Sequence, residues 1–239
     1  MKKLYFLFFT LLISGASFGQ TTLAPGDIII TSIITDGNDR FEFIPLVDLQ
    51  AGTVIYFTES GWDATAGAWR NTDLSEGSLT YTAPSAVTRG TVIYVEEDAT
   101  VEGQINNPTN GSVIKNNFGN NWGLSNSGDQ IIAFQGTPPP GWDGTGTNPF
   151  PTPIFLFAVT SHSTSWHDAS ETTNTAIPTG LVQGTTAVAV GAGSNDGDEF
   201  DNAYFDAVTN PLTGLTKLQI LALVGNPANW IGNNTEPTG

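Results

Sequence analysis

Two loops rich in Asp, Asn and Gly carry the residue types that hold a calcium ion. One covers residues 36–39 (DGND), with Glu42 three positions further on, and the other covers residues 195–202 (NDGDEFDN). Calcium takes about six to eight oxygen ligands, and glycine lets backbone carbonyls turn inward in such loops. Neither loop has the spacing of an EF-hand. The same residue types also form ordinary turns between strands, so both interpretations stay open.

Of the two loops, we prefer the second as a calcium site, and calcium is the only cofactor that the sequence suggests. A backbone carbonyl near Gly197 would add to the side-chain oxygens. The predicted metal ligands are Asn195, Asp196, Asp198, Glu199 and Asp201.

Both histidines lie in one polar segment, residues 161–171 (SHSTSWHDASE). His162 and His167, followed by Asp168 and Glu171, have the residue types of a transition-metal site or of a Ser-His-Asp hydrolase. The chain has no G-x-S-x-G turn to present a serine nucleophile and no H-E-x-x-H metal motif. A solvated loop is therefore the favoured interpretation, and a secreted hydrolase is kept as the second alternative function.

Four of the six tryptophans fall in predicted loops. An indole plane can stack on the apolar face of a sugar ring, or it can cap the end of a hydrophobic core. Trp62 and Trp122 are assigned to packing. The predicted glycan contacts, which make a carbohydrate-binding accessory protein the first alternative function, are Trp69, Trp142 and Trp166.

The elements that position these residues are predicted to be strands, because runs rich in β-branched and aromatic residues alternate with Gly, Asp, Asn and Pro. The run at residues 154–160 (IFLFAVT) is continuously apolar, which indicates a strand in the middle of a sheet with both faces buried. The predicted strands cover residues 27–34, 41–47, 53–58, 78–82, 91–96, 130–134, 154–160, 185–190 and 203–208.

Glycines mark several element boundaries. Gly52, Gly90 and Gly184 each precede a threonine that opens a predicted strand, and we expect a backbone conformation there that other residues resist. One short helix is predicted over residues 216–224, with Gly225 in the position of a C′ glycine and Pro227 preventing continuation. Residues 136–153 are rich in Pro, Gly and Thr and are predicted to form a long external loop.

The first nineteen residues are typical of a cleaved export signal. Lys2 and Lys3 precede an apolar run over residues 4–13, and Ser17 and Gly19 supply the small residues before the expected cleavage. The run is too short for a membrane-spanning helix, which needs about 20 apolar residues. We therefore expect a secreted or cell-surface protein with no transmembrane segment after cleavage.

Charge narrows the range of partners. The formal net charge is −16, and loss of residues 1–19 removes two lysines and no acids, which brings it to −18. Such a field repels phosphate backbones, so nucleic acid is not an expected partner. A surface protein or a polysaccharide is the expected kind of partner. The absence of cysteine excludes disulfides and thiol catalysis, so stability has to come from core burial.

Three stretches, residues 26–62, 77–98 and 122–136, together resemble the bacterial lamin-tail-like domain, an immunoglobulin-like β-sandwich. The resemblance is carried by Glu42, the Ser60-Gly61-Trp62 turn, the Gly90-Thr91 pair and residues 124–129 (LSNSGD). It departs at residues 45–47, where the family usually has a polar stretch. Residues 150–231 are similar to a second half found in long exported proteins of gliding and marine bacteria of the Bacteroidetes type.

The resemblance implies an all-β, immunoglobulin-like or lamin-tail-like sandwich, extended by further strands and one short C-terminal helix. We expect residues 20–231 to form a single domain, made of a lamin-tail-like part (26–136) and a second part (150–231), with residues 232–239 as a tail or linker. The implied function is a non-catalytic binding, adhesion or scaffolding module. The resemblance names no ligand.

Overall fold

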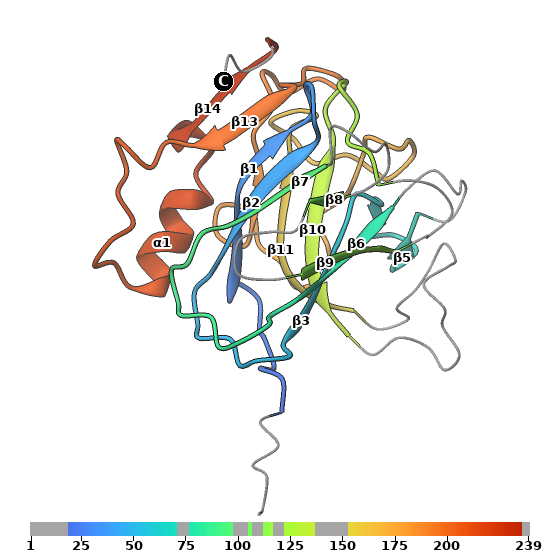
Figure 1. Ribbon diagram of the computed structural model, residues 1–239. Helices are drawn as coiled ribbons and strands as arrows, with labels where there is room; N and C mark the ends of the chain where they lie inside the picture. Colours follow the sequence, from blue (N-terminus) through green and yellow to red (C-terminus); the bar gives the residue numbers. More distant parts are fainter. Residues whose placement is uncertain are drawn as a thin grey trace, which may run out of the picture.

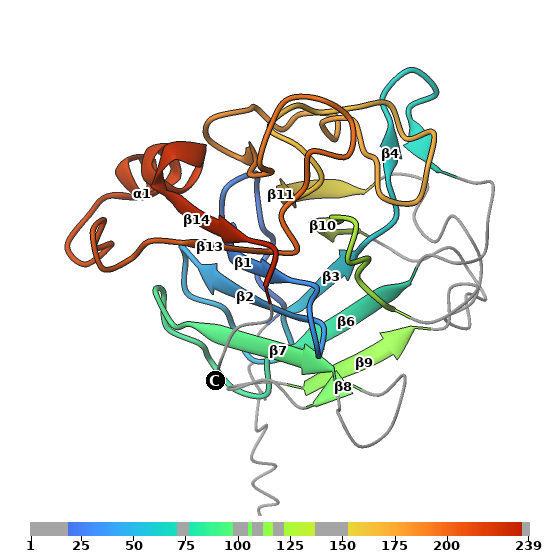
Figure 2. The same cartoon turned by 90° about the horizontal axis from the view of Figure 1, so that it is seen from above.

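Two six-stranded β-sheets face each other in the computed structural model (Figure 1) (Figure 2). The structure describes residues 19–70, 77–97, 105–106, 112–116, 122–136 and 153–235. Within them the regular secondary structure is almost entirely strand, with one short α-helix and one 3-10 helix, which confirms the all-β prediction.

Each sheet joins strands from both parts of the chain. The first sheet is antiparallel throughout, whereas β11 and β12 pair in parallel in the second. Each sheet has two strands of the C-terminal part at one edge beside four strands of the N-terminal part, so the second part extends both sheets. The first sheet has the order β14 (Trp230–Asn233), β13 (Asn202–Phe205), β1 (Ile28–Ile34), β2 (Arg40–Pro45), β7 (Ile93–Glu97) and β8 (Ile105–Asn106). The second has the order β12 (Ala187–Ala189), β11 (Ile154–Thr160), β10 (Gln130–Gln135), β3 (Val54–Thr58), β6 (Ser78–Thr82) and β9 (Ser112–Asn116).

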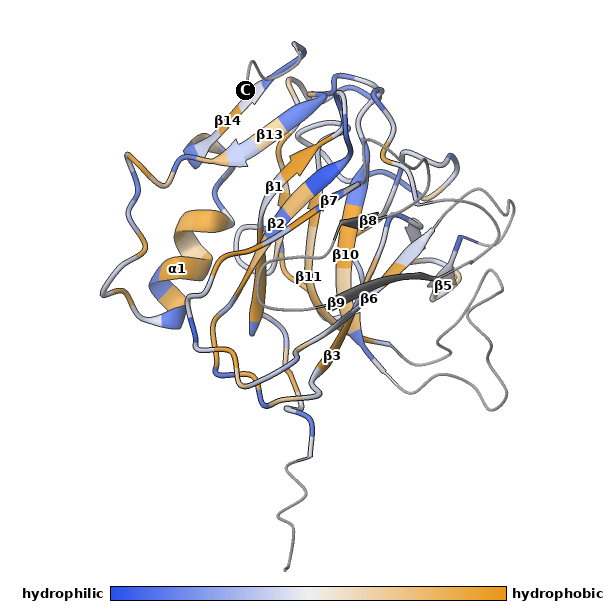
Figure 3. Cartoon of the chain, in the orientation of Figure 1, coloured by the Kyte–Doolittle hydropathy of each residue, from blue (hydrophilic) through white to orange (hydrophobic). Residues whose placement is uncertain are grey.

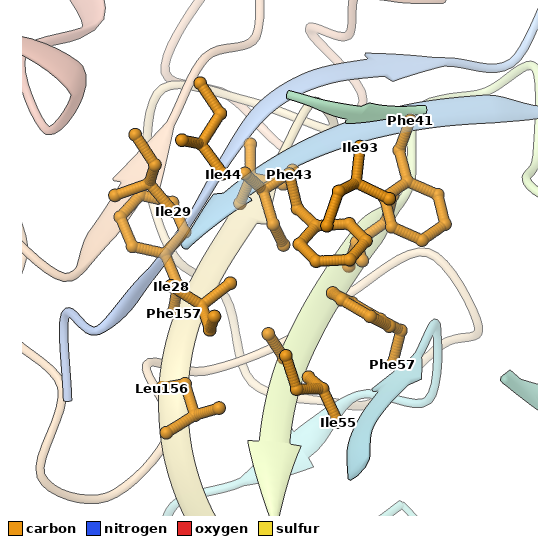
Figure 4. Packing of buried hydrophobic residues seen from close by; sticks show 14 of the residues in the cluster. Ile28, Ile29, Phe41, Phe43, Ile44, Ile55, Phe57, Ile93, Leu156 and Phe157 are labelled. Carbon is orange, nitrogen blue, oxygen red and sulfur yellow. The ribbon is translucent and has the colours of Figure 1, made fainter. Parts of the chain in front are cut away.

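The main hydrophobic core lies between the sheets. Side chains alternate along β2, so Phe41 and Phe43 enter the core while Arg40 and Glu42 lie on the opposite face. The ring centroid of Phe57, on β3, lies 4.9 Å from that of Phe41 and 4.8 Å from that of Phe43. These rings meet between β2 and the second sheet (Figure 4). Burial of each such side chain stabilises the fold by about 1.5–3 kcal/mol.

The second sheet is also covered on its outer face. Phe134 on β10 and Phe155 on β11 project away from the main core into a second cluster. Trp62 and Trp69, from the hairpin of β4 (Trp62–Asp63) and β5 (Ala68–Trp69), pack on them with centroids 4.8–5.4 Å apart. Strand β11 is therefore buried on both faces, as its apolar run predicts, although its neighbour β12 is an edge strand.

Helix α1 (Lys217–Val224) packs against the main core through Ile220, Leu221 and Val224. Thr216 and Gln219 form a capping box at its start. The predicted C′ position of Gly225 is wrong, because this residue is the C-cap itself and is right-handed with φ −70°. Glycine fits there for lack of space, since a Cβ on Gly225 would lie 2.3 Å from the carbonyl carbon of Gly184. The short 3-10 helix η1 (Pro227–Asn229) follows.

The C-terminal residues extend further into the sheet than the sequence indicates. Strand β14 runs through Asn233, which pairs with Asn202 of β13, whereas residues 232–239 are predicted to be a tail. Asn202 Nδ2 also donates to the backbone carbonyl of Thr235 at 3.0 Å. Most of the predicted external loop, residues 136–153, lies outside the described residues.

The three Gly-Thr pairs share one conformation. Gly52, Gly90 and Gly184 have φ of 79°, 85° and 84°, the left-handed region expected for them. A Cβ at any of these positions would meet no atom within 4 Å. The backbone conformation alone therefore calls for glycine there.

The turn before β10 is built differently. The Asp129 carboxylate accepts a hydrogen bond from the Ser125 backbone N–H at 2.8 Å, which closes the LSNSGD turn. Gly128 has φ 77°, and a Cβ there would lie 2.6 Å from Cα of His162. Glycine is needed both for the backbone angle and for the close approach of the residues after β11.

We expect Gly128→Ala to destabilise the protein more than Gly52→Ala. The left-handed angle costs about 1–2 kcal/mol in both variants, and overlap with His162 adds about 1–3 kcal/mol at Gly128 alone. Denaturant unfolding of both variants measures the difference. Equal losses would contradict the packing argument.

Candidate functional site

His162 ties together three segments that are distant in the sequence. It follows β11 directly, and its Nδ1 lies 3.1 Å from the backbone carbonyl of Ser127 in the LSNSGD turn. Its Nε2 lies 2.7 Å from Oδ1 of Asp196 and 3.0 Å from the backbone nitrogen of Gly197. The hydrogen bond with His162 holds the pKa of Asp196 below its ordinary value. Both ring nitrogens are therefore engaged, Nδ1 with the LSNSGD turn and Nε2 with the acidic loop.

The second histidine pairs with a serine, but the pair is enclosed. His167 Nε2 lies 2.9 Å from Oγ of Ser163, the spacing of a nucleophile and its base. Ser163 is 0% exposed, its hydroxyl donates to the carbonyl of Ser165 at 2.7 Å, and its backbone carbonyl accepts from Gly191. A serine nucleophile has to reach its substrate, so this arrangement does not support the hydrolase alternative. Asp168 and Glu171 are exposed.

The predicted calcium ligands make separate local contacts. Asp196 turns to His162, whereas Oδ2 of Asp198 accepts from the backbone and side-chain nitrogens of Asn195 at 2.9 and 2.7 Å. Burial, with a smaller contribution from Asp36 and Glu199, raises the pKa of Asp201. Among the described residues no three Asp, Glu or His side chains converge as metal ligands. The predicted set Asn195, Asp196, Asp198, Glu199 and Asp201 is therefore not assembled as a cage.

We expect calcium to raise the melting temperature no more than sodium chloride does at matched ionic strength, because both only screen the acidic chain. Asp198→Ala should lower the free energy of unfolding by about 1 kcal/mol through loss of the Asn195 contacts, with or without calcium. Calorimetric melting of both proteins in both salts measures this. A stabilisation by calcium that Asp198→Ala removes would restore the calcium hypothesis.

Two of the three predicted glycan-binding tryptophans, Trp69 and Trp166, lie within the described residues. Trp69 lies in β5 rather than in a loop and is 2% exposed, so its ring packs on Trp62 and Phe134 and is not free to stack on a sugar. Trp166 is half-buried against the outer cluster of the second sheet. Trp142 lies outside the described residues.

The outer face of the first sheet differs from the other sheet faces. Both hydrophobic clusters of the described residues lie elsewhere, one between the sheets and one outside the second sheet. Polar residues interrupt the apolar pattern on β2 and β13 (Figure 3). We call this surface the open face, and its residues follow from the strand pairing. One cross-strand row is Ile231, Tyr204, Ser32, Glu42 and Tyr94, and the next is Asn233, Asn202, Ile34, Arg40 and Glu96.

The open face contains a hollow of about 560 Å³. Its lining combines the Tyr94 and Tyr204 rings with the charged heads of Arg40 and Glu42. Thr31 lies at its floor, because β1 has one extra residue between the pairs Ile30–Phe43 and Ser32–Glu42. Such a β-bulge re-aims a side chain and is common beside binding sites.

Partial burial shifts the pKa values of two titratable groups in the hollow. Burial raises the pKa of Glu42 above its ordinary value, although Thr31 and Arg40 act in the opposite direction. Burial also raises the pKa of Tyr94, with the neighbouring Glu96 carboxylate adding to the effect. Arg40 Nη1 lies 3.9 Å from Oε1 of Glu96, a loose ion pair at the rim. Groups held out of water in a concave site are candidates for ligand contacts.

Sequence reasoning singled out Glu42 only beside the first acidic loop and within the family resemblance, and it missed Arg40, Tyr94 and Tyr204, although a signal for them exists. The segments 40–43 (RFEF), 93–96 (IYVE) and 202–205 (NAYF) alternate strictly, which indicates strands with one buried face. The partners in each row depend on the pairing of β1 with β13, which no local pattern reveals.

Comparison with known proteins adds no relative. The chain matches no family model, no curated protein and no solved structure. Among the described residues no helix has the length and apolar character to cross a membrane.

Glu42→Gln is expected to raise the melting temperature at pH 7. The folded protein holds this carboxyl at a pKa above the ordinary value of 4.5, so its charged form disfavours folding at neutral pH. As the pH falls through the raised pKa towards 4.5, Glu42 takes up its proton in the folded state and the cost disappears. The melting curves of the variant and the parent should therefore converge in acid.

Exposed Glu171→Gln serves as the control for that comparison, because it removes one carboxylate from the same chain outside the hollow. Equal shifts in the two variants would assign the effect to net charge rather than to the buried carboxyl.

Proposed function

We propose that the mature chain is a non-catalytic binding module of an exported protein, and that the open face is its binding surface. The observation that carries this proposal is the asymmetry of the two sheets. Strands β3, β10 and β11 of the second sheet are covered by apolar packing on both faces, whereas the first sheet has a hollow lined by tyrosine, arginine and glutamate on its outer face.

Packing does not account for the side chains of the hollow. Arg40, Glu42 and Tyr94 point away from the main core, in strands whose inward residues already fill it. The partly buried Glu42 carboxylate works against folding at neutral pH. Surface groups that weaken the fold in this way are characteristic of sites kept for binding.

The export signal and the charge support a location outside the cell membrane. Residues 1–19 have the pattern of a cleaved signal, and the remaining chain has no cysteine that an oxidising exterior could pair. The acidic charge disfavours nucleic acids and anionic membrane surfaces as ligands. A surface protein or a polysaccharide remains the expected class of partner.

A sedimentation assay tests the binding surface. The purified mature protein is mixed with the cell envelopes and secreted polymers of the bacterium that produces it, and the unbound fraction is measured. We expect Tyr204→Ala combined with Glu42→Gln to abolish most of the depletion, because both substitutions remove contacts of the hollow.

The matched control combines Trp166→Ala with Glu171→Gln, which removes one aromatic ring and one carboxylate outside the first sheet. Equal binding by both double variants would show that the open face is not the binding surface.

A further inference from the structure

We propose that the open face binds a neutral polysaccharide, with the sugar chain lying across the strands and stacked on Tyr204 and Tyr94. This inference rests on the proposed function of the open face and specifies the chemistry of its ligand. It is carried by the spacing of the two rings, by a weakly paired hydroxyl at the floor between them and by the mixed charge of the polar groups.

The two tyrosines lie in one row on either side of the hollow. Tyr204 on β13 pairs with Ser32, Ser32 with Glu42, and Glu42 with Tyr94 on β7. Three strand steps of about 4.8 Å place the two side chains roughly 14 Å apart, a span that a short run of sugar units covers. Tyr204 is 40% exposed and Tyr94 half-buried, so both rings have apolar surface at the hollow. Such rings offer a flat apolar face and a polar hydroxyl at the edge.

The floor between the rings has a weakly paired polar group. Thr31 is 6% exposed, and its Oγ1 makes no hydrogen bond of good geometry within the described part of the chain. A weak side-chain hydrogen bond joins it to the Glu42 carboxylate and lowers the Glu42 pKa against the effect of burial. A ligand hydroxyl entering the hollow would give Thr31 a hydrogen bond of better geometry.

The polar groups around the floor suit hydroxyl groups better than ions. A sugar hydroxyl both donates and accepts, and the hollow presents the Glu42 carboxylate as acceptor beside the Arg40 guanidinium as donor. Both side chains are planar forks, which can engage neighbouring hydroxyls in pairs.

The charge of the surface disfavours a polyanion. Arg40 faces Glu42 and Glu96 in the two rows, and the whole chain has a net charge of −16. A sulfated or uronic-acid polymer would meet this acidic field without a basic patch to offset it. The expected ligand is therefore an uncharged chain.

Affinity gel electrophoresis and calorimetric titration with laminarin, galactomannan, arabinoxylan and dextran test the inference, with alginate as the anionic comparison. We expect at least one neutral polymer to bind and alginate not to bind. Tyr204→Ala should weaken the binding of that polymer at least tenfold, while Trp166→Ala leaves it unchanged.

Thr31→Val separates binding from folding. It removes the hydroxyl and keeps nearly the same shape, so we expect weaker polysaccharide binding, about threefold or more, with an unchanged or higher melting temperature. A melting temperature that falls instead would assign the Thr31 hydroxyl a role in the fold and overturn its role in binding.

The outcomes distinguish this inference from the function on which it rests. If no neutral polymer binds, or if only alginate does, while sedimentation with envelopes still depends on Tyr204 and Glu42, the polysaccharide inference fails and the open face remains a binding surface for another partner. If a neutral polymer binds but Tyr204→Ala has no effect and Trp166→Ala abolishes binding, the inference and the proposed surface both fail.

Discussion

The double burial of the second sheet is the constraint on which the rest of the structure depends. Strands β10 and β11 present large apolar side chains on both faces, so two separate layers have to cover them. The first sheet forms one layer, and the β4–β5 hairpin with the segment 161–186 forms the other. The path of that segment brings His162 to the acidic loop and encloses Ser163. His162 and Ser163, which have the residue types of a reactive site, therefore stabilise the segment that covers the second sheet.

Hydrogen bonds of a few polar groups join this cover to the sheet beneath it. Gln130 is fully buried, and its side-chain amide donates to the backbone carbonyls of Glu59 and Thr172, joining the second sheet to the covering segment. Thr175 Oγ1 accepts from the backbone N–H of Trp62 at 2.9 Å. An apolar sheet face can be covered by irregular chain only if the backbone groups of that chain find partners. The first sheet has no such cover among the described residues, which leaves its alternating strands with a face towards water.

Much of the fold could be predicted from the sequence because the strand pattern is strong. The strands over residues 78–82 and 154–160 have the predicted bounds, and the helix begins one residue after its Thr216 cap. The pattern is weaker where strands are two to five residues long, so β4, β5, β8, β9 and β14 are not indicated. The binding candidates were harder to predict, because residue type alone favours Asp loops and tryptophans. Whether Trp69 is covered, and whether Tyr204 lies in the same row as Tyr94, depends on pairings between distant segments.

The pairing of β1 with β13 has a consequence for the order of folding. Ser32 and Tyr204 are neighbours across the sheet but 172 positions apart in the chain. Contacts of such long range form slowly, because the entropy of closing a large loop is lost before the contacts stabilise the chain. The first sheet cannot be completed until β13 and β14, the last of its strands along the chain, have been synthesised. A chain that ends before β13 would also lack Asn202 and Tyr204, and with them one side of the hollow.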